Sequence, residues 1–436
     1  MTHARVFAVA LPIILSNATV PLVGIADTAV MGQLDDAALL GAVALASTIF
    51  SMLFWAFGFL RMGTTGLTAQ AAGARDWAEV EAHLYRGLLI AGVAGFLLIA
   101  SNVPLARLSF HLIDASPAVE TAAADYFGLR ILSAPAALGG YALVGWFIGL
   151  ARADIAFVLQ VFLNLLNVTL NVALVLGLGY GIEGVAIATV IAEYVALAVG
   201  LVIAWRMIAR KGVKRDRAAI FARDQLRRVF AVNADIMIRT LGLLFVFTFF
   251  MAESAGLGDV TLAANSVLRN FMMLSAYVLD GFAYAAEVLA GQAIGAQARK
   301  TFRQAAYLSS IWALGLAILV SFAFAAGGGL LIDLMTVTPE VRTLAREYLF
   351  WVALSPVIAV ACFQLDGIFI GATRTTDIRN MMIVSVAVFF VAWAVLTPLF
   401  GNHGLWAALM VFFVIRAVTL GLRYPALERD AFPNRA

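Results

Sequence analysis

Long apolar runs recur along the whole chain, and they limit what it can fold into more than any other feature. Short polar, charged or Gly/Pro clusters separate the runs, and a helix that crosses a bilayer needs about 20 predominantly apolar residues. Only 13% of the residues are charged, against about 25% in a typical soluble protein, and 63% are hydrophobic. The sequence therefore predicts an all-α polytopic membrane protein, and its formal net charge of +3 gives no reason to expect a nucleic-acid partner.

Division of the chain at these clusters predicts about twelve transmembrane helices. They cover approximately residues 6–32, 38–72, 82–104, 119–150, 155–178, 184–208, 227–255, 260–295, 302–325, 340–372, 378–399 and 404–424. Several of these segments exceed 30 residues. We therefore expect tilted helices that project beyond the bilayer.

The charges of the loops predict the orientation of the chain. Loops after even-numbered spans carry Arg75, Arg152 and the strongly basic segment 209–226, whereas loops after odd-numbered spans carry acidic residues such as Asp35 and Asp259. Lys and Arg are retained on the cytoplasmic side of a membrane. Both termini and the basic segment are therefore expected to be cytoplasmic.

The two halves of the chain repeat each other at a constant offset of 222 residues. The motif AQAAGA (69–74) returns as GQAIGA (291–296), and VGWFIGLAR (144–152) returns as DGIFIGATR (366–374). A constant register over several landmarks is the signature of an internal repeat. Because each half has an even number of spans, both halves enter the membrane in the same sense, which predicts a pseudo-twofold axis along the membrane normal.

This repeat divides the chain into an N-terminal six-helix lobe (1–208), a basic cytoplasmic linker (209–226) and a C-terminal six-helix lobe (227–436). Two packed helical lobes with a cleft between them suit alternating access. The sequence has no GxxxxGK[ST] nucleotide-binding loop, so an ion gradient is the expected energy source unless transport is passive. With one cysteine and four scattered histidines, we expect no metal site and no cofactor.

Asp27 places a carboxylate inside the apolar stretch PLVGIADTAVMG (21–32). An Asp at the centre of a membrane helix costs about 2.5–3.5 kcal/mol, and such acids usually face a cavity or pathway. Pro21 cannot donate a hydrogen bond to the carbonyl of Asn17, so the first span is expected to bend there. Asp27 beside this hinge predicts a group that couples protonation to helix shape; the structural alternative is an acid that caps a kink or bonds a neighbouring helix.

A row of small polar residues on the fifth span accompanies Asp27. Asn164, Asn167 and Asn171 are spaced three and four residues apart, which places them on one helix face. On the sixth span, Thr189 lies at a similar depth, with Glu193 one turn further in. These residues predict a polar cluster in the N-terminal lobe, which serves either as a proton or cation site or as interhelical hydrogen bonding.

A second group of charges is expected nearer the cytoplasm. Arg61, Arg239, Asp280 and Glu287 lie at comparable depth, and the two acids are seven residues apart on one helix face. They predict a compensated network between the lobes, either structural or involved in transport. Asp366, which opens the glycine-rich DGIFIG of the tenth span, is a further candidate in the C-terminal lobe.

Six segments of the chain carry a family resemblance. They are LSNATVPLVGIADTAVMGQL, FLRMGTTGLTAQAAGA, LNLLNVTLNVALVLGL, GVAIATVIAEY, AYVLDGFAYAAEVLAGQAIGA and LDGIFIGATRTTDIRNMM. Together they resemble the DinF branch of the MATE (multidrug and toxic compound extrusion) family over nearly the whole chain. The resemblance implies a two-lobed antiporter of twelve helices. It implies export of small amphipathic, often cationic compounds in exchange for H⁺ or Na⁺. We expect a monomer in the bacterial inner membrane, with both termini cytoplasmic as the loop charges predict.

The resemblance also assigns roles to single residues. Asp27 matches the acid of the first helix, whose protonation bends that helix at a proline, and Asn167 matches an asparagine of the fifth helix. Asn171 stands where relatives often carry an aspartate, so coupling is expected to depend more on Asp27. The acid that the NorM branch carries in the middle of its seventh helix is absent here, and Arg239 occupies the inner half of that span.

Two other functions compete with export. A flippase of a lipid-linked precursor would need a strongly cationic central cavity, and on the sequence only Arg61 and Arg239 offer positive charge there. A membrane-embedded enzyme would need a convergent nucleophile, metal or acid/base set, which scattered histidines and one cysteine do not provide. We therefore expect a transporter and no enzymatic activity.

Overall fold

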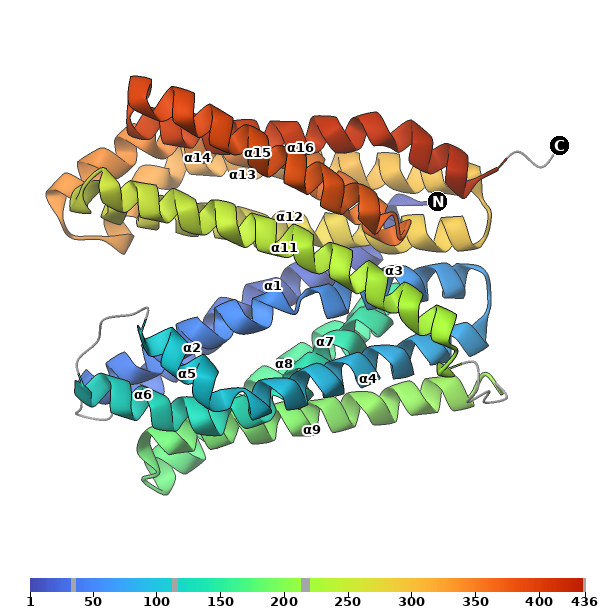
Figure 1. The fold of residues 1–436 in the computed structure, drawn as a ribbon, viewed down its shortest axis with the longest axis horizontal. Coiled ribbons are helices and arrows are strands. Elements are labelled where there is room, and N and C mark those ends of the chain that lie inside the picture. The colour runs from blue at the N-terminus through green and yellow to red at the C-terminus, as the bar shows by residue number, and fades with distance from the viewer. Residues whose placement is uncertain (33–36, 112–116, 213–219, 434–436) are drawn as a thin grey trace. The chain divides into compact units, whose positions relative to one another are not determined.

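The computed structural model describes residues 1–32, 37–111, 117–212 and 220–433, with side chains described except at 20–29, 31, 37–40, 108–111 and 117–119. Every regular element in these ranges is a helix (Figure 1). The elements are α1 (His3–Met31), α2 (Ala37–Ala56), α3 (Phe59–Gly73), α4 (Trp77–Ala100), α5 (Asn102–His111), α6 (Pro117–Arg130), the 3₁₀ helix η1 (Ile131–Ser133), α7 (Ala134–Gly149), α8 (Ala153–Asn171), the π-helix η2 (Val172–Gly177) and α9 (Gly181–Ala209). They continue with α11 (Arg223–Gly256), α12 (Asp259–Gly295), α13 (Arg299–Met335), α14 (Pro339–Gly371), α15 (Thr375–Phe400) and α16 (Asn402–Ala431).

The helices confirm the predicted polytopic all-α fold. In the described residues, 11 helical segments are long and apolar enough to cross a membrane, and α1 contributes the shorter apolar helix His3–Thr19. The longest, α12 and α13, each have 37 residues. At 1.5 Å per residue such a helix is about 55 Å long, which exceeds a hydrocarbon core of about 30 Å.

Packing divides the described chain into two compact units. The N-terminal unit comprises residues 15–72 and 76–230, and the C-terminal unit comprises residues 1–14, 73–75 and 231–436. The start of α1 belongs to the C-terminal unit because the Phe7 ring packs edge-on against Phe282 and Trp312, with centroid distances of 5.6 and 4.7 Å. The division at 1–208, 209–226 and 227–436 stays a prediction about the two sequence repeats.

The helix ends repeat at the offset seen in the sequence. In the N-terminal half, α6, η1 and α7 together run from Pro117 to Gly149, and α14 runs from Pro339 to Gly371, 222 residues later at both ends. The left-handed turns that follow repeat as well: Ala151 has φ 57° and Thr373 has φ 53°. Non-glycine residues seldom adopt positive φ, so turns of this kind at equivalent positions indicate that the two halves fold by one local plan.

Each unit also contains the same close helix crossing. A Cβ atom built on Gly145 would lie 2.3 Å from the carbonyl oxygen of Arg61, and one built on Gly367 would lie 2.3 Å from that of Ala283. Gly371, one turn after Gly367, approaches the backbone of Glu287 in the same way. Glycines four residues apart allow two membrane helices to approach backbone to backbone. The glycines of the repeated motif are therefore explained by packing.

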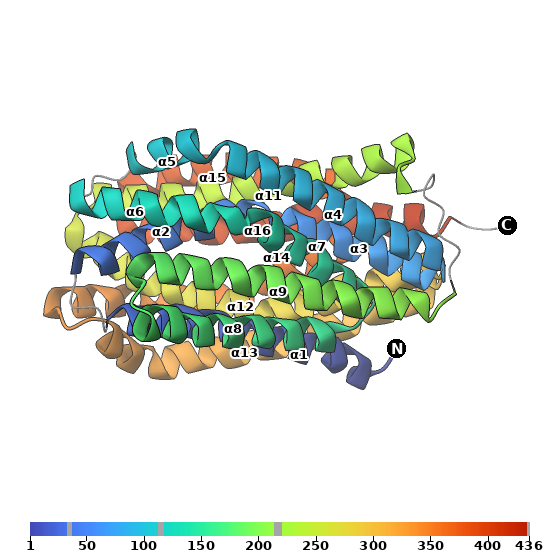
Figure 2. The ribbon, with the colours of Figure 1, turned by 90° about the horizontal axis from the view of Figure 1, so that it is seen from below.

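The two repeats differ in the regularity of their helices. In the C-terminal half, α12 and α14 are continuous, whereas their counterparts in the N-terminal half are broken between α2 and α3 and at η1. A further irregularity, the π-helix η2, directly follows Asn171 at the end of α8. Helices α8 and α9 lie side by side (Figure 2). Short 3₁₀ and π segments inside longer helices often mark hinges, and here they gather in the N-terminal half.

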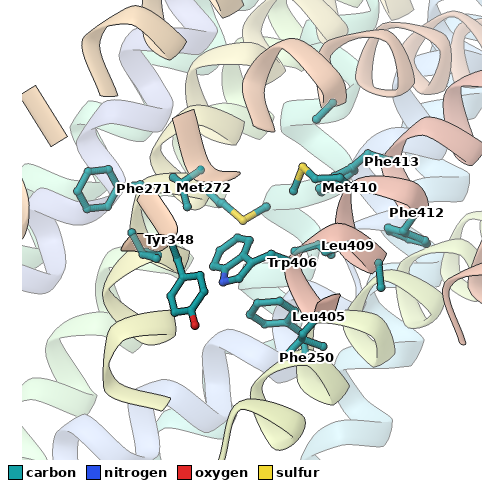
Figure 3. Close-up of a cluster of buried hydrophobic side chains, with 14 of the residues drawn as sticks. Phe250, Phe271, Met272, Tyr348, Leu405, Trp406, Leu409, Met410, Phe412 and Phe413 are labelled. Carbon is teal, nitrogen blue, oxygen red and sulfur yellow. The ribbon is translucent and has the colours of Figure 1, made fainter. Parts of the chain in front are cut away.

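The C-terminal unit has a core of aromatic and methionine side chains. Trp406, Phe250, Met272, Met410 and Phe412 belong to it (Figure 3). The Phe250 and Trp406 rings meet edge-on at 4.9 Å. We call this group the aromatic–methionine cluster.

Candidate functional site

The polar row predicted on α8 forms a hydrogen-bonded ladder with α9. The side-chain amide of Asn171 donates to Oδ1 of Asn167 at 3.1 Å, and the amide of Asn167 donates to Oγ1 of Thr189 at 2.9 Å. The hydroxyl of Thr189 in turn donates to the carbonyl of Val185 at 2.9 Å. Asn167 and Asn171 are both buried. The structure therefore brings together three of the predicted residues, and we call them the amide ladder.

Asn164 makes a different connection. Its side-chain amide donates to Oγ1 of Thr19 on α1 at 3.0 Å, while its Oδ1 accepts from Gln160 at 2.9 Å. Thr19 belongs to the helix that carries Asp27, and α1 runs from His3 to Met31. The side chains of Asp27 and Pro21 lie outside the described residues, so their roles stay predictions. What the structure adds is a direct hydrogen bond between α8 and α1.

A largely buried ion pair lies next along α9. Glu193, four residues after Thr189, accepts from a guanidinium nitrogen of Arg130 on α6 at 2.8 Å, and each side chain is 12% exposed. The guanidinium also lies over the rings of Phe50 and Phe54, 5.4 Å from each centroid. Cation–π contacts of this kind stabilise a desolvated cation. The sequence named Glu193 but missed Arg130, whose position inside an apolar span was the available signal.

The C-terminal unit contains a group of three charged side chains that we call the Asp366 triad. Nη2 of Arg239 on α11 and Nη2 of Arg416 on α16 both donate to Oδ2 of Asp366 on α14, the second at 2.5 Å. The exposed fractions of the side chains are 8% for Arg239, 2% for Arg416 and 5% for Asp366. The sequence named two members of the triad as separate candidates and missed Arg416.

Arg416 and Arg130 correct one expectation. The sequence predicts only Arg61 and Arg239 as positive charges inside the membrane, yet Arg416 is also buried within an apolar helix and the Arg130 side chain is only 12% exposed. Each was detectable as a lone arginine in a hydrophobic run. Arg130 and Arg416 both contact a carboxylate, as a buried charge requires.

The remaining members of the predicted inner charge group are distributed over both units. Asp280 and Glu287 lie on α12 of the C-terminal unit, where Glu287 is buried, and Arg61 lies on α3 of the N-terminal unit. Arg239, which was expected to join them, pairs with Asp366. A network between the lobes stays a prediction.

Comparison with known proteins gives a consistent result. The MatE family model matches residues 12–173 and 236–396. DNA damage-inducible protein F of Escherichia coli (strain K12) is 41% identical over 417 residues, covering 94% of this chain and 89% of that protein. A probable multidrug resistance protein NorM of Pseudomonas putida is 26% identical over 434 residues, covering 94% of this chain and 91% of that protein.

Solved structures agree with this chain in fold. An outward-facing multidrug resistance MATE family transporter of the MOP superfamily superimposes with a TM-score of 0.85 at 17% identity, covering 98% of this chain and 97% of that one. MATE in the bent conformation gives a TM-score of 0.87 at 18% identity, covering 98% and 96% of the two chains. At these identities the likeness shows the fold alone.

Proposed function

Because the chain belongs to the MatE family, whose members are transporters and not enzymes, we propose that it is a secondary active multidrug efflux antiporter. It exports small amphipathic or cationic compounds by alternating access in exchange for protons, with Na⁺ as the other candidate ion. It acts as a monomer in the bacterial inner membrane with both termini in the cytoplasm. The family membership and the similarity to a probable multidrug resistance protein NorM support the export function.

The observation that carries the coupling proposal is the hydrogen bond between Asn164 on α8 and Thr19 on α1. Thr19 precedes Asp27 by eight residues, or about 12 Å of helix at 1.5 Å per residue. A change in the shape of α1 near Pro21 would therefore move α8 through this hydrogen bond. The amide ladder then connects α8 to α9. This arrangement supports a mechanism in which three helices respond together to one protonation event.

In this mechanism Asp27 carries the exchanged proton. Its neutral and charged forms differ in their cost of burial among apolar groups, so each exchange alters the preferred shape of α1. Amides and hydroxyls such as those of the amide ladder can donate to a carboxylate or accept from a carboxylic acid. They are therefore suited to stabilising either state of an acid, and their oxygens also suit a bound Na⁺.

The broken helices of the N-terminal half support the same assignment. The π-helix η2 begins directly after Asn171, so the amide ladder adjoins a segment whose hydrogen-bond register is already altered. A segment of that kind can change its register more easily than a regular helix. We therefore assign the coupling movement to the N-terminal half.

Transport by purified protein in liposomes tests the proposal. With a pH gradient imposed, wild-type protein is expected to export a fluorescent amphipathic cation and to release protons when the cation is added. Asp27→Asn mimics the protonated acid permanently, so it should fold and insert but lose gradient-driven export and proton release. Replacing K⁺ by Na⁺ without a pH gradient distinguishes Na⁺ coupling from H⁺ coupling.

Glu253→Gln is the matched control for this experiment. Glu253 is another carboxylate on an apolar helix, and it accepts a hydrogen bond from the Trp393 indole at 3.1 Å in the C-terminal unit. It should retain export and proton release. Asp27→Asn protein that exports at the wild-type rate with an unchanged pH profile would make Asp27 structural.

A further inference from the structure

The Asp366 triad has more positive than negative charge. One carboxylate, that of Asp366, accepts from two guanidinium groups, those of Arg239 and Arg416, so the three side chains together carry a charge of +1. All three are more than nine-tenths buried. A buried charge that lacks a counter-charge is strongly unfavourable, so the triad is suited to receive one more negative charge.

The hydrogen bonds of the triad lead to the same conclusion. Both arginines donate to the same oxygen, Oδ2 of Asp366. The Nε–H groups of Arg239 and Arg416 are buried without a hydrogen-bond acceptor, and Oδ1 of Asp366 is buried without a hydrogen-bond donor. A guanidinium has five N–H donors. The two arginines therefore have more N–H donors than one carboxylate oxygen can accept hydrogen bonds from. A small anion or an anionic group would accept from the two unused Nε–H groups.

The apolar surroundings of the triad define the rest of the ligand. The guanidinium of Arg416 lies 5.4 Å from the ring centroid of Phe412, which belongs to the aromatic–methionine cluster. Methionine and aromatic side chains adapt to apolar ligands of varied shape. The Phe412 ring beside Arg416 therefore gives an anionic group with an apolar body one apolar neighbour at the triad.

We propose that the Asp366 triad is an anion-binding site that takes one monovalent anionic group, either the carboxylate or sulfonate head of an amphipathic compound or a free halide. For the amphipathic compound, the proposal rests on the export function and extends the substrate class from cations to amphipathic anions and zwitterions. The negative charge completes the charge balance of the triad, and its oxygens or the halide accept from the unused Nε–H donors.

The chain contains a built-in control for the stoichiometry of the charges. Oε1 of Glu428 also accepts from two arginines, Arg299 and Arg303, each at 2.6 Å. Those arginine side chains are 48% and 60% exposed, so water can satisfy their remaining donors. Arg299→Gln thus removes a charge from a group of the same net charge whose arginines are exposed.

Binding of two matched fluorescent probes tests the proposal on purified full-length protein in detergent. The probes are dansylaminoundecanoate and dansylaminoundecylammonium, which share the fluorophore and the chain and differ in the sign of the head group. We expect the carboxylate probe to bind wild-type protein at least tenfold more tightly than the Arg239→Gln variant, because that substitution leaves a neutral Asp366–Arg416 pair. Arg299→Gln should leave its affinity within twofold of wild type.

Two further arms keep the test decisive. Asp366→Asn raises the charge of the triad and should strengthen anion binding, the opposite of the effect of Arg239→Gln, and this reversal cannot come from unfolding. Thermal unfolding in chloride and in gluconate distinguishes a free halide from an amphipathic head group. If chloride stabilises wild-type protein and Arg239→Gln abolishes this effect, the ligand is a free halide. If chloride fails to displace the bound carboxylate probe, the ligand is an amphipathic head group.

The proposal is overturned if the carboxylate probe and chloride act equally on wild type, Arg239→Gln and Asp366→Asn, because the triad then holds water only. Export of the ammonium probe from liposomes is measured beside these assays. Loss of cation export with triad-dependent anion binding intact would contradict the proposed efflux function and leave the anion site standing. Cation export without triad-dependent anion binding would overturn the anion site and leave the proposed efflux function standing.

Discussion

Replacing Gly145 by alanine is predicted to push apart two helices of the N-terminal unit. The new Cβ would lie 2.3 Å from the carbonyl oxygen and 3.0 Å from the Cα of Arg61, and these are backbone atoms that cannot rotate aside. Overpacking costs about 1–3 kcal/mol, and contact with the main chain places this case at the upper end. Alanine in a helix interior recovers about 1 kcal/mol relative to glycine. The net loss of unfolding free energy is therefore expected to be about 2 kcal/mol.

Gly140→Ala on the same helix, α7, is the control for this prediction. A Cβ at Gly140 meets no atom within 4 Å, so this variant should gain up to about 1 kcal/mol from helix propensity. Denaturation by dodecyl sulfate in mixed micelles, followed by tryptophan fluorescence, measures both variants. Equal stability of Gly145→Ala and Gly140→Ala would refute the close crossing as the reason for the repeated glycine.

Three further predictions concern the ion pair, the helix link and the topology. Glu193→Gln should cost about 3 kcal/mol of unfolding free energy because Arg130 is then buried without its carboxylate, and adding Arg130→Met should recover part of that loss; equal losses in the single and double variants would contradict the pair. Asn164→Ala should slow export about fivefold, as expected for loss of the α8–α1 hydrogen bond of about 1 kcal/mol, while leaving substrate affinity in detergent unchanged; its other lost hydrogen bond, from Gln160, lies within α8. An unchanged rate would remove the α8–α1 link from the mechanism. A reporter inserted after Gly212 should be cytoplasmic and one after Leu257 external, and the reverse pattern would overturn the orientation.

The fold could be predicted from the sequence because its main determinants are periodic and local. Apolar runs gave the helices, and the 222-residue repeat anticipated the matching helix ends of α14 and of α6 to α7. Helix boundaries were less accurate where a cap decided them. The third predicted span, helix α4, starts at Trp77, before the predicted residue 82, because the Asp76 side chain accepts from the Glu79 N–H at 3.0 Å and caps the helix.

The sites were predicted in part, according to how many helices each one joins. Asn167 and Asn171 lie on one helix, so their spacing alone placed them on a shared face with Thr189 opposite. The Asp366 triad joins three helices, and no spacing within one helix indicates that Arg416 on α16 meets Asp366 on α14. Partners of buried charges depend on how the helices pack, and the sequence does not contain that information in a local pattern.

The two repeats keep the same framework and differ in the polar groups attached to it. Both retain the glycine crossing at equivalent positions, Gly145 and Gly367, because a change there would disturb the backbone contact that each unit requires. On this framework, the N-terminal half carries a neutral amide ladder beside an irregular helix, and the C-terminal half carries a charged triad between continuous helices, with Asp366 directly before the crossing glycine Gly367. A neutral ladder can adjust to the proton of one acid, whereas a salt-bridged triad holds three helices in fixed register. The division of labour that we propose, with coupling in the N-terminal half and anion recognition in the C-terminal half, follows from this difference in chemistry on a common scaffold.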